Sequence, residues 1–326
     1  MTVKAIQIAE FGDPAAIEVS DIPAPSDPGP GEVRLDVKGV GVGYFDGLLI
    51  RGDYQIRPDL PFVPGSSLAG VVESVGDGVS HLSPGQAVAA FALHGGMAEQ
   101  VVLPASSCAP LPEGIEPVAA ANFFISWATS LYGLREIGGV REGDTVLVLG
   151  AAGSTGTTAI QCAKALGARI IACASSEEKR KHCLDHGADV VVDYTGEGWR
   201  DEVKAATDKR GVDAVYDPVG GEMSEPALRL MAPGGRFLVV GFVNGIANIP
   251  MNLPLLKRCS IHGVNWGGTV MADPSVVPPV IETLAEWTLT GAIDPAPTHS
   301  YSLEDAGEAF AALFSRQSRG SLVVTP

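Results

Sequence analysis

One stretch, residues 145–179, most constrains what this chain can fold into. It opens with an apolar run at 146–149, of the kind found in strands that are buried on both faces. The glycine-rich segment GAAGSTG at 150–156 follows at once. A helical pattern then runs to Gly167, where it stops, and a second apolar run spans 168–174. This order predicts a strand, a tight turn, a helix and a second strand.

The three glycines of the turn indicate what it binds. Glycine allows a sharp turn and a close approach of backbone N–H groups to a ligand, and the helix that follows presents its positive end to an anion. Between a buried strand and a helix, this pattern is typical of dinucleotide binding; the alternative is a tight turn without a ligand. The residues expected to hold the pyrophosphate are Gly150, Ala152, Gly153, Ser154, Thr155 and Gly156.

The end of the second strand distinguishes the two common nicotinamide dinucleotides. An NAD site usually places Asp or Glu about 20 residues after the glycines, where it accepts a hydrogen bond from the ribose 2′-OH. Here residues 174–176 read Ala-Ser-Ser, and Lys179 and Arg180 follow. No carboxylate would repel a 2′-phosphate and two cations are near, so we expect NADPH rather than NADH. Alternatively, Ser176 only caps the next helix and Lys179 is a solvated surface charge.

The whole chain sets wider limits. Its 326 residues suffice for two domains, and 46% hydrophobic and 18% charged residues are typical of a soluble globular protein. The net charge of −16 argues against a nucleic-acid partner. No apolar run reaches the length of a membrane span and the first residues lack a signal-peptide core, so we expect a cytoplasmic protein without membrane contact.

The cysteines and histidines are scattered. Five cysteines without a C-x-x-C pair predict reduced, mostly buried thiols. His182 and His186 stand four residues apart on a predicted helix, where we expect a solvated face rather than a metal site.

The pattern of strands and helices predicts an α/β protein. Residues 1–122 contain short strands between Gly- and Pro-rich turns, typical of a compact, barrel-like β domain. A buried helix at 119–132 leads into six strands with intervening helices, which fit a doubly wound parallel sheet. These strands are expected at 146–149, 168–174, 189–194, 213–217, 236–241 and 260–266, with a helix at 225–231. The tail adds helices at 280–290 and 304–316 and a strand at 321–325, which is expected to return to the first domain.

Together these residues resemble the medium-chain dehydrogenase/reductase superfamily, and within it the zinc-free quinone oxidoreductases. The motifs that carry the resemblance are GVGYFD at 41–46, PGSSLAG at 64–70, the segment 150–156, YDPVGG at 216–221, GGRFLVVGF at 234–242 and GSLVV at 320–324. It implies a GroES-like β domain at 1–122 and 267–326, and a Rossmann domain with a six-stranded parallel sheet at 123–266. It also implies a homodimer that pairs the last strand of that sheet across a two-fold axis.

Departures from the zinc-dependent branch indicate that both of its metals are missing. That branch has a Cys ligand in a G-V-C-x-x-D segment and a His and a Glu in a G-H-E segment, where this chain has Gly43 and Gly65-Ser66-Ser67. Glycine offers no ligand atom, and serine is a poor ligand for Zn²⁺. The four cysteines of the structural zinc lobe are also absent from 87–103.

The resemblance assigns candidate residues to the substrate pocket: Tyr44, Asp46, Tyr54 and Thr129. Asp46 would lie beside the nicotinamide, or would only cap a helix starting near Gly47. Tyr54 would donate to a developing oxyanion, or would be an amphipathic wall residue. Thr129 would hold the nicotinamide, or would only satisfy its own helix.

The resemblance also extends the cofactor site. Ser175, Lys179 and Tyr194 match positions that hold the 2′-phosphate and adenosine, although Tyr194 at the end of an apolar strand is also a typical core residue. The loops that pass the nicotinamide would be formed by Gly241 and Phe242 and by Asn265 and Trp266, although Trp266 fits a subunit contact as well.

Without zinc, no Lewis acid polarises an isolated carbonyl. We therefore expect hydride transfer from NADPH to an acceptor that delocalises the incoming charge, in the cleft between the domains. The leading hypothesis is a quinone reductase. An enoyl or alkenal reductase is the alternative, since it uses the same geometry and needs a proton donor as well. A non-catalytic NADPH-binding protein, as in lens crystallins of this family, is the alternative of another class.

Overall fold

The computed structural model describes residues 1–326, which form two compact units. The first contains residues 1–125 and 281–326, and the second contains residues 126–280. The second junction therefore lies inside helix α10 (Val277–Leu289), beyond the expected boundary at 266/267. None of the helices is long and apolar enough to cross a membrane.

The first unit is built around a seven-stranded sheet. Its path is β14-β15-β3-β4-β5-β7, and β6 pairs with β3 beside that path. A two-stranded sheet, β1 with β2, completes the strands. The elements are β1 (Thr2–Ile6), β2 (Val19–Pro23), β3 (Glu32–Gly41), α1 (Tyr44–Arg51), β4 (Ser67–Val75), β5 (Ala87–Phe91), β6 (Gln100–Pro104), β7 (Cys108–Pro110), α2 (Pro117–Ala120), β14 (His299–Ser302), α11 (Ala306–Phe314) and β15 (Leu322–Thr325).

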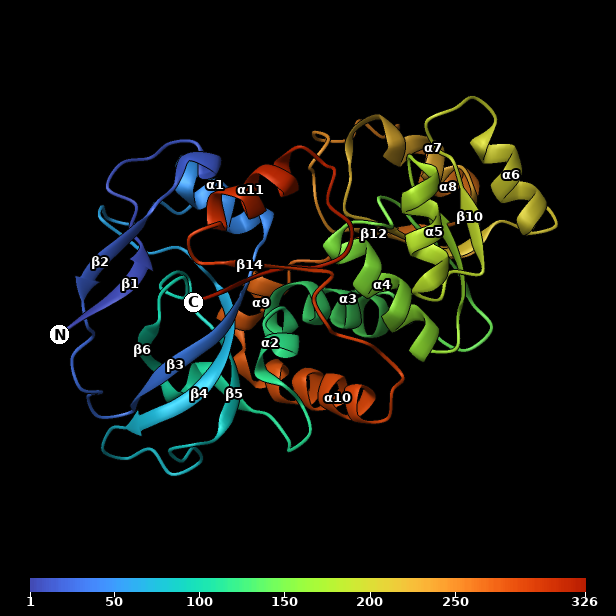
Figure 1. The fold of residues 1–326 in the computed structure, drawn as a ribbon. Coiled ribbons are helices and arrows are strands. Elements are labelled where there is room, and N and C mark those ends of the chain that lie inside the picture. Colours follow the sequence, from blue (N-terminus) through green and yellow to red (C-terminus); the bar gives the residue numbers. More distant parts are fainter. The chain divides into compact units, whose positions relative to one another are not determined.

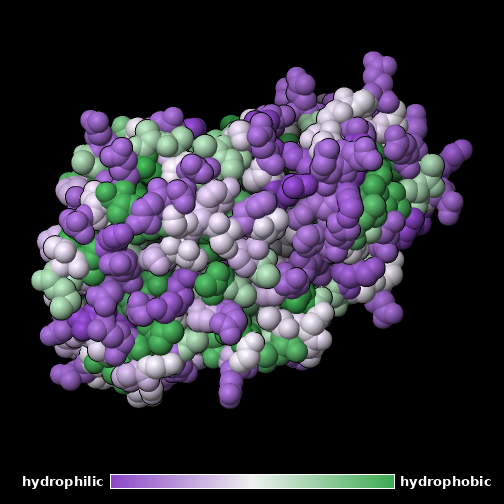
Figure 2. Space-filling view, in the orientation of Figure 1, coloured by the Kyte–Doolittle hydropathy of each residue, from purple (hydrophilic) through white to green (hydrophobic).

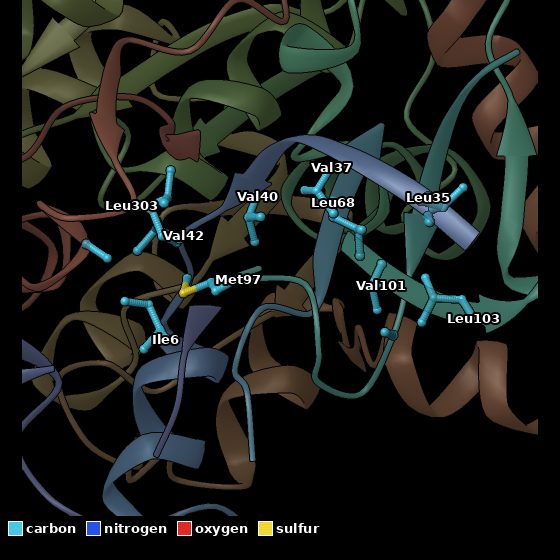
Figure 3. Packing of buried hydrophobic residues seen from close by; sticks show 14 of the residues in the cluster. Ile6, Leu35, Val37, Val40, Val42, Leu68, Met97, Val101, Leu103 and Leu303 are labelled. Carbon is cyan, nitrogen blue, oxygen red and sulfur yellow. The ribbon is translucent and has the colours of Figure 1, made fainter. Parts of the chain in front are cut away.

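Strand β3 forms the centre of this unit because its side chains alternate. Val33, Leu35 and Val37 are buried, whereas the residues between them are only partly covered. This period of two is the one that gives a strand one apolar face. Figure 3 shows Leu35 and Val37 of β3 in the core together with Leu68 of β4 and with Val101 and Leu103 of β6.

The end of the chain completes the first unit, as expected. Strand β15 pairs antiparallel with β3, with Val324 opposite Val40. Asn122 strengthens this join, because its side-chain amide donates to the carbonyl of Leu322 at 3.3 Å.

The second unit contains a six-stranded sheet in the order β10-β9-β8-β11-β12-β13, in which every pair is parallel. This confirms the doubly wound arrangement; Figure 1 shows helices α4 and α5 alongside the sheet. The elements are α3 (Ala128–Leu131), β8 (Thr145–Val148), α4 (Ser154–Ala165), β9 (Arg169–Cys173), α5 (Glu177–Asp185), β10 (Val190–Val192), α6 (Trp199–Ala206), β11 (Val212–Asp217), α7 (Ser224–Leu228), β12 (Met231–Val239), α8 (Asn252–Lys257), β13 (Ser260–Gly263) and α9 (Trp266–Ala272). Around α3, the segments 123–127 and 132–137 form π-helical turns.

Two expected elements of the second unit end earlier than their apolar patterns suggested. The helix expected at 225–231 stops at Leu228, because Met231 already pairs with Val212 of β11. The strand expected at 260–266 stops at Gly263, because Asn265 caps the next helix, α9. In both places an apolar residue serves the following element rather than the preceding one.

The thiols follow expectation and the histidine pair does not. All five cysteines are free and four of them are buried. His182, expected on a solvated face, is buried: its Nε2 lies 2.9 Å from the hydroxyl of Thr157 on α4, and its ring packs against His186. On the face shown in Figure 2, apolar side chains occur in small groups between hydrophilic ones.

Replacing Gly47 by valine should destabilise the first unit. A Cβ at Gly47 would lie 2.5 Å from the ring of Phe314, so that α1 and α11 would have to separate. We expect a loss of about 1–3 kcal/mol in the free energy of unfolding, measured by urea denaturation. Gly12→Val is the matched control, because nothing lies within 4 Å of a Cβ at Gly12. Equal stability of the two variants would contradict this packing.

Candidate functional site

The glycine turn lies between β8 and α4 as predicted. Gly150 has a φ of 55°, and the N–H of Gly153 closes the turn on the carbonyl of Gly150 at 3.0 Å. A Cβ at Gly156 would lie 2.4 Å from that same carbonyl oxygen, so only glycine lets the helix sit this close to the turn. No side chain caps α4 at Gly153. The first backbone N–H groups of α4, including that of Ser154, therefore remain available to an anion.

A set of hydroxyl groups behind the turn holds α4 against α3. Ser126 and Ser154 place their hydroxyls 2.8 Å apart. Deeper in the unit, Ser130 contacts Thr158 at 2.7 Å and the phenol of Tyr216 at 3.1 Å, and burial raises the pKa of that phenol. Sequence reasoning missed this network; the only signal was the presence of hydroxyl residues on a helix that otherwise reads as apolar. It fixes the first turn of α4.

The residues expected around the adenosine lie at the carboxyl ends of β9 and β10. These strands are joined beyond their ends, because the N–H of Ala174 donates to the carbonyl of Val192. Ser175 is exposed at the tip of β9. Ser176 caps α5, accepting from the N–H of Lys179 at 3.3 Å. Tyr194 is half-buried and packs against the core of the second unit.

Arg180 differs from expectation. Its guanidinium donates to Asp193 at 2.8 Å and to the carbonyl of Ala174 at 3.4 Å, so it ties the ends of β9 and β10 together. The hydroxyl and the N–H of Thr195, followed by Arg180, lower the pKa of Asp193. Of the two cations expected near a 2′-phosphate, Arg180 is thus directed to a carboxylate.

The residues expected beside the nicotinamide fall into two groups. Gly241 and Phe242 follow β12, and the Phe242 side chain is 58% exposed. Asn265 instead caps α9, accepting from the N–H of Gly268 at 3.0 Å. Trp266 is buried and its ring packs on Tyr132 of the same unit.

Three of the four expected pocket residues belong to the first unit. Helix α1 begins at Tyr44, so Asp46 lies in its first turn and not before a helix starting near Gly47; Gly43 is the cap. The hydroxyl of Tyr44 donates to the carbonyl of Leu313 at 3.2 Å. Tyr54 packs edge-on against Phe45, with ring centroids 4.8 Å apart. Thr129 is half-buried on α3, in the second unit.

Asp46 is the most perturbed of these groups. It is 0% exposed, and neither carboxyl oxygen makes a hydrogen bond of good geometry. The buried Ser66 hydroxyl makes none either. Burial raises the pKa of Asp46 to about 6, and the polar groups of Ser66 and the N–H of Gly43 oppose this only in part.

The positions that correspond to the zinc ligands of the zinc-dependent dehydrogenases carry no set of metal-binding side chains in this chain. Gly43 has no side chain, and the Ser67 hydroxyl donates to the carbonyl of Ala121 at 2.7 Å. Across residues 1–326, three or more His, Cys, Asp or Glu side chains do not gather anywhere in a way that would hold a metal ion.

Comparisons with known proteins agree with this architecture. Residues 29–113 match the alcohol dehydrogenase GroES-like domain, and residues 154–286 match the family described as zinc-binding dehydrogenase. A quinone oxidoreductase of Pseudomonas aeruginosa is 34% identical, with 99% of each chain covered. The quinone oxidoreductase-like protein 2 of Rattus norvegicus is 35% identical over 93% of this chain and 87% of its own.

A solved structure extends the likeness to three dimensions. Escherichia coli quinone oxidoreductase, complexed with NADPH, superposes with a TM-score of 0.89 at 27% identity, covering 99% of this chain and 100% of its own. The fold and the matches define an oxidoreductase of the medium-chain dehydrogenase/reductase superfamily. Within that superfamily, the chain belongs to the quinone oxidoreductase family.

The buried carboxyl of Asp46 predicts a stability that depends on pH. The folded-state pKa of about 6 lies above the value of 3.8 for an exposed aspartate, so folding favours the protonated form. The contribution of this carboxyl to the free energy of unfolding is fully present below pH 3.8 and declines as the pH rises to about 6. As the pH rises from 4 to 7, the free energy of unfolding of Asp46→Asn should therefore increase relative to that of the wild type, by up to about 3 kcal/mol.

Urea denaturation at both pH values measures this gain, and Asp59→Asn, on an exposed loop, is the control. A constant difference between Asp46→Asn and the wild type at the two pH values would contradict the raised pKa.

Proposed function

We propose that this protein is an NADPH-dependent oxidoreductase that transfers hydride to a quinone without zinc. One observation carries the proposal: the uncapped N-terminus of α4, packed on the glycine turn at the carboxyl end of β8. Such a turn binds the pyrophosphate of a dinucleotide. The quinone oxidoreductase complexed with NADPH, which shares this fold, supports the choice of cofactor and of acceptor class.

The end of β9 supports NADPH over NADH. Ser175 is exposed there, and the nearby carboxylate of Asp193 is paired with Arg180, so no unpaired carboxylate at the tip repels a 2′-phosphate. Lys179 supplies the positive charge from the first turn of α5, and Tyr194 supplies a ring at the end of β10. When bound, NADPH supplies a hydride; the chain contributes binding, orientation and hydrogen bonds.

The donor chemistry at the zinc position supports a reaction without that metal. Gly43 and the serines at 66 and 67 make a poor ligand set. An acceptor must then spread the negative charge itself, and a quinone does so over its conjugated ring. This favours a quinone over an isolated ketone.

In this proposal the pocket residues have different roles. Tyr54 has no hydrogen bond to its hydroxyl within the chain, so that group can donate to the reduced acceptor. The hydroxyl of Tyr44 is already used by Leu313, which favours a role for Tyr44 as a wall residue. Asp46, buried in the first turn of α1, has its pKa raised to about 6 and would change its protonation state just below neutral pH. Thr129 would contact the nicotinamide.

Replacing Lys179 by methionine should weaken the binding of NADPH and leave NADH nearly unchanged. Methionine keeps the aliphatic stem but removes the charge that would meet the 2′-phosphate. We expect the KM for NADPH to rise about 10–100-fold, which corresponds to the loss of a charge-assisted contact. Lys181→Met, on the same helix, is the control. A wild-type preference for NADH would contradict the cofactor assignment.

A panel of acceptors followed by the absorbance of NADPH tests the reaction. Quinones, α,β-unsaturated carbonyls and simple ketones are compared with and without a metal chelator. We expect quinones to be reduced fastest, ketones not at all, and the chelator to have no effect. Preference for an enone, abolished in Tyr54→Phe or Asp46→Asn, would favour the reductase that needs a proton donor. Binding of NADPH without turnover on any acceptor would indicate a non-catalytic protein.

We further propose a homodimer formed along strand β13. This strand pairs only with β12 and lies at the edge of the sheet, where its unpaired backbone groups can bind a second copy. Apolar side chains are exposed on and before it: Ile261, Leu255 and Leu256.

Ile261→Lys should convert the dimer to a monomer, because a charge on an edge strand opposes pairing. Light scattering measures the mass of each form. Leu184→Lys, which alters an exposed leucine on α5, is the control. A monomeric wild type would contradict the dimer.

A further inference from the structure

Asp217 is a buried carboxylate that the proposed function has not used. It ends β11 and is 1% exposed. One of its oxygens accepts from the N–H groups of Val219 and Gly220, both at 2.9 Å, and the other accepts the hydroxyl of Ser224 at 2.5 Å. Three donors converge on this one side chain, so it fixes the loop that follows the strand.

That loop is packed backbone to backbone against the loop after β12. The N–H of Asn244 donates to the carbonyl of Val219 at 2.8 Å, and the N–H of Gly221 donates to that of Gly245 at 2.7 Å. Gly220 has φ 71° and ψ −155°, a conformation almost confined to glycine, and a Cβ there would lie 2.5 Å from the carbonyl oxygen of Gly245. We call residues 217–221 and 241–245 the paired loops.

The paired loops stand next to the glycine turn. Strands β8 and β11 are neighbours at the point where the winding of the sheet reverses, which is where ligands of such folds bind. A Cβ at Gly150 would lie 2.7 Å from Cγ2 of Val219, so the first paired loop touches the turn directly. Phe242 and Val243 are exposed on the second.

The two halves of a dinucleotide would therefore meet different parts of this edge. With the pyrophosphate on the turn after β8, the adenosine half lies toward β9 and β10, whose ends carry Ser175 and Tyr194. The nicotinamide half then lies toward β11 and β12, on the opposite side of the turn, where the paired loops stand.

We propose that Asp217 is a positioning residue: it holds the paired loops as the wall for the nicotinamide half of the cofactor. This inference rests on the proposed function. Without the carboxylate, the N–H groups of Val219 and Gly220 lose their acceptor in a buried place, and the Gly220 conformation loses its support. Asparagine would retain much of this role, because its oxygen can accept from both N–H groups and its amide can donate to the oxygen of Ser224.

Calorimetric titration with two ligands tests the inference. NADPH contacts both halves of the site, whereas 2′,5′-ADP contains only the adenosine half. For Asp217→Ala we expect the Kd of NADPH to rise about tenfold and that of 2′,5′-ADP to stay within about twofold of the wild type. Asp217→Asn should restore NADPH binding to within about threefold of the wild type. Circular dichroism confirms that each variant is folded.

The outcomes separate the two proposals. A wild type that binds neither ligand contradicts the proposed function. A folded Asp217→Ala that binds NADPH as the wild type does, or that loses both ligands equally, contradicts the role of Asp217. If Asp217→Ala does not fold, Ser224→Ala removes one donor alone. It should weaken NADPH about two- to threefold and spare 2′,5′-ADP, and unchanged NADPH binding would again overturn the inference.

Discussion

The close approach of helix α4 to the turn after β8 is the constraint on which the second unit depends. The helix can reach the turn only because Gly156 has no side chain opposite the carbonyl of Gly150. The contact between the hydroxyls of Ser126 and Ser154 then holds the helix in this position. Its first turn then stands after the carboxyl end of β8 in the parallel sheet. The proposed site for an anion therefore depends mainly on backbone geometry.

The two units position their candidate residues in different ways. In the second, the ends of adjacent parallel strands bring short loops to one edge, and the loops are fixed by hydrogen bonds such as those of Asp217. In the first, the candidates lie on and after a single short helix, α1, where Gly47 packs against Phe314 of α11 and Asp46 is fully buried. The arrangement in the second unit suits a ligand held by main-chain groups. The arrangement in the first unit suits side chains whose protonation is controlled by their surroundings.

The features predicted correctly from sequence are those that a local pattern determines. The buried run of β8 and the glycine turn each lie within a few residues, and both were placed correctly. The return of β15 to the first unit was also predicted, because a six-stranded sheet was already complete without it; its pairing with β3 was not.

The errors and omissions arise where a distant partner decides. Arg180 was expected near a phosphate, but it forms an ion pair with Asp193, which directly follows the next strand. His182 was expected in solvent, but Thr157 of the neighbouring helix contacts it. The polar contacts of Ser130 with Thr158 and Tyr216 were missed for the same reason. Side-chain pairs that form only after the strands and helices have packed leave no periodic trace in the sequence.

The pairing of β15 with β3 has a consequence for how the chain is made. The central strand of the first unit leaves the ribosome early, yet its neighbour Leu322–Thr325 is translated only after the whole of the second unit. Residues 126–280 hold all six strands of their own sheet and can mature while synthesis continues. During that interval only the Val40–Gly41 end of β3 lacks this partner, because residues 32–36 already pair with β6. A stop codon before Leu322 would leave this end of β3 unpaired and would also remove the partner of β14.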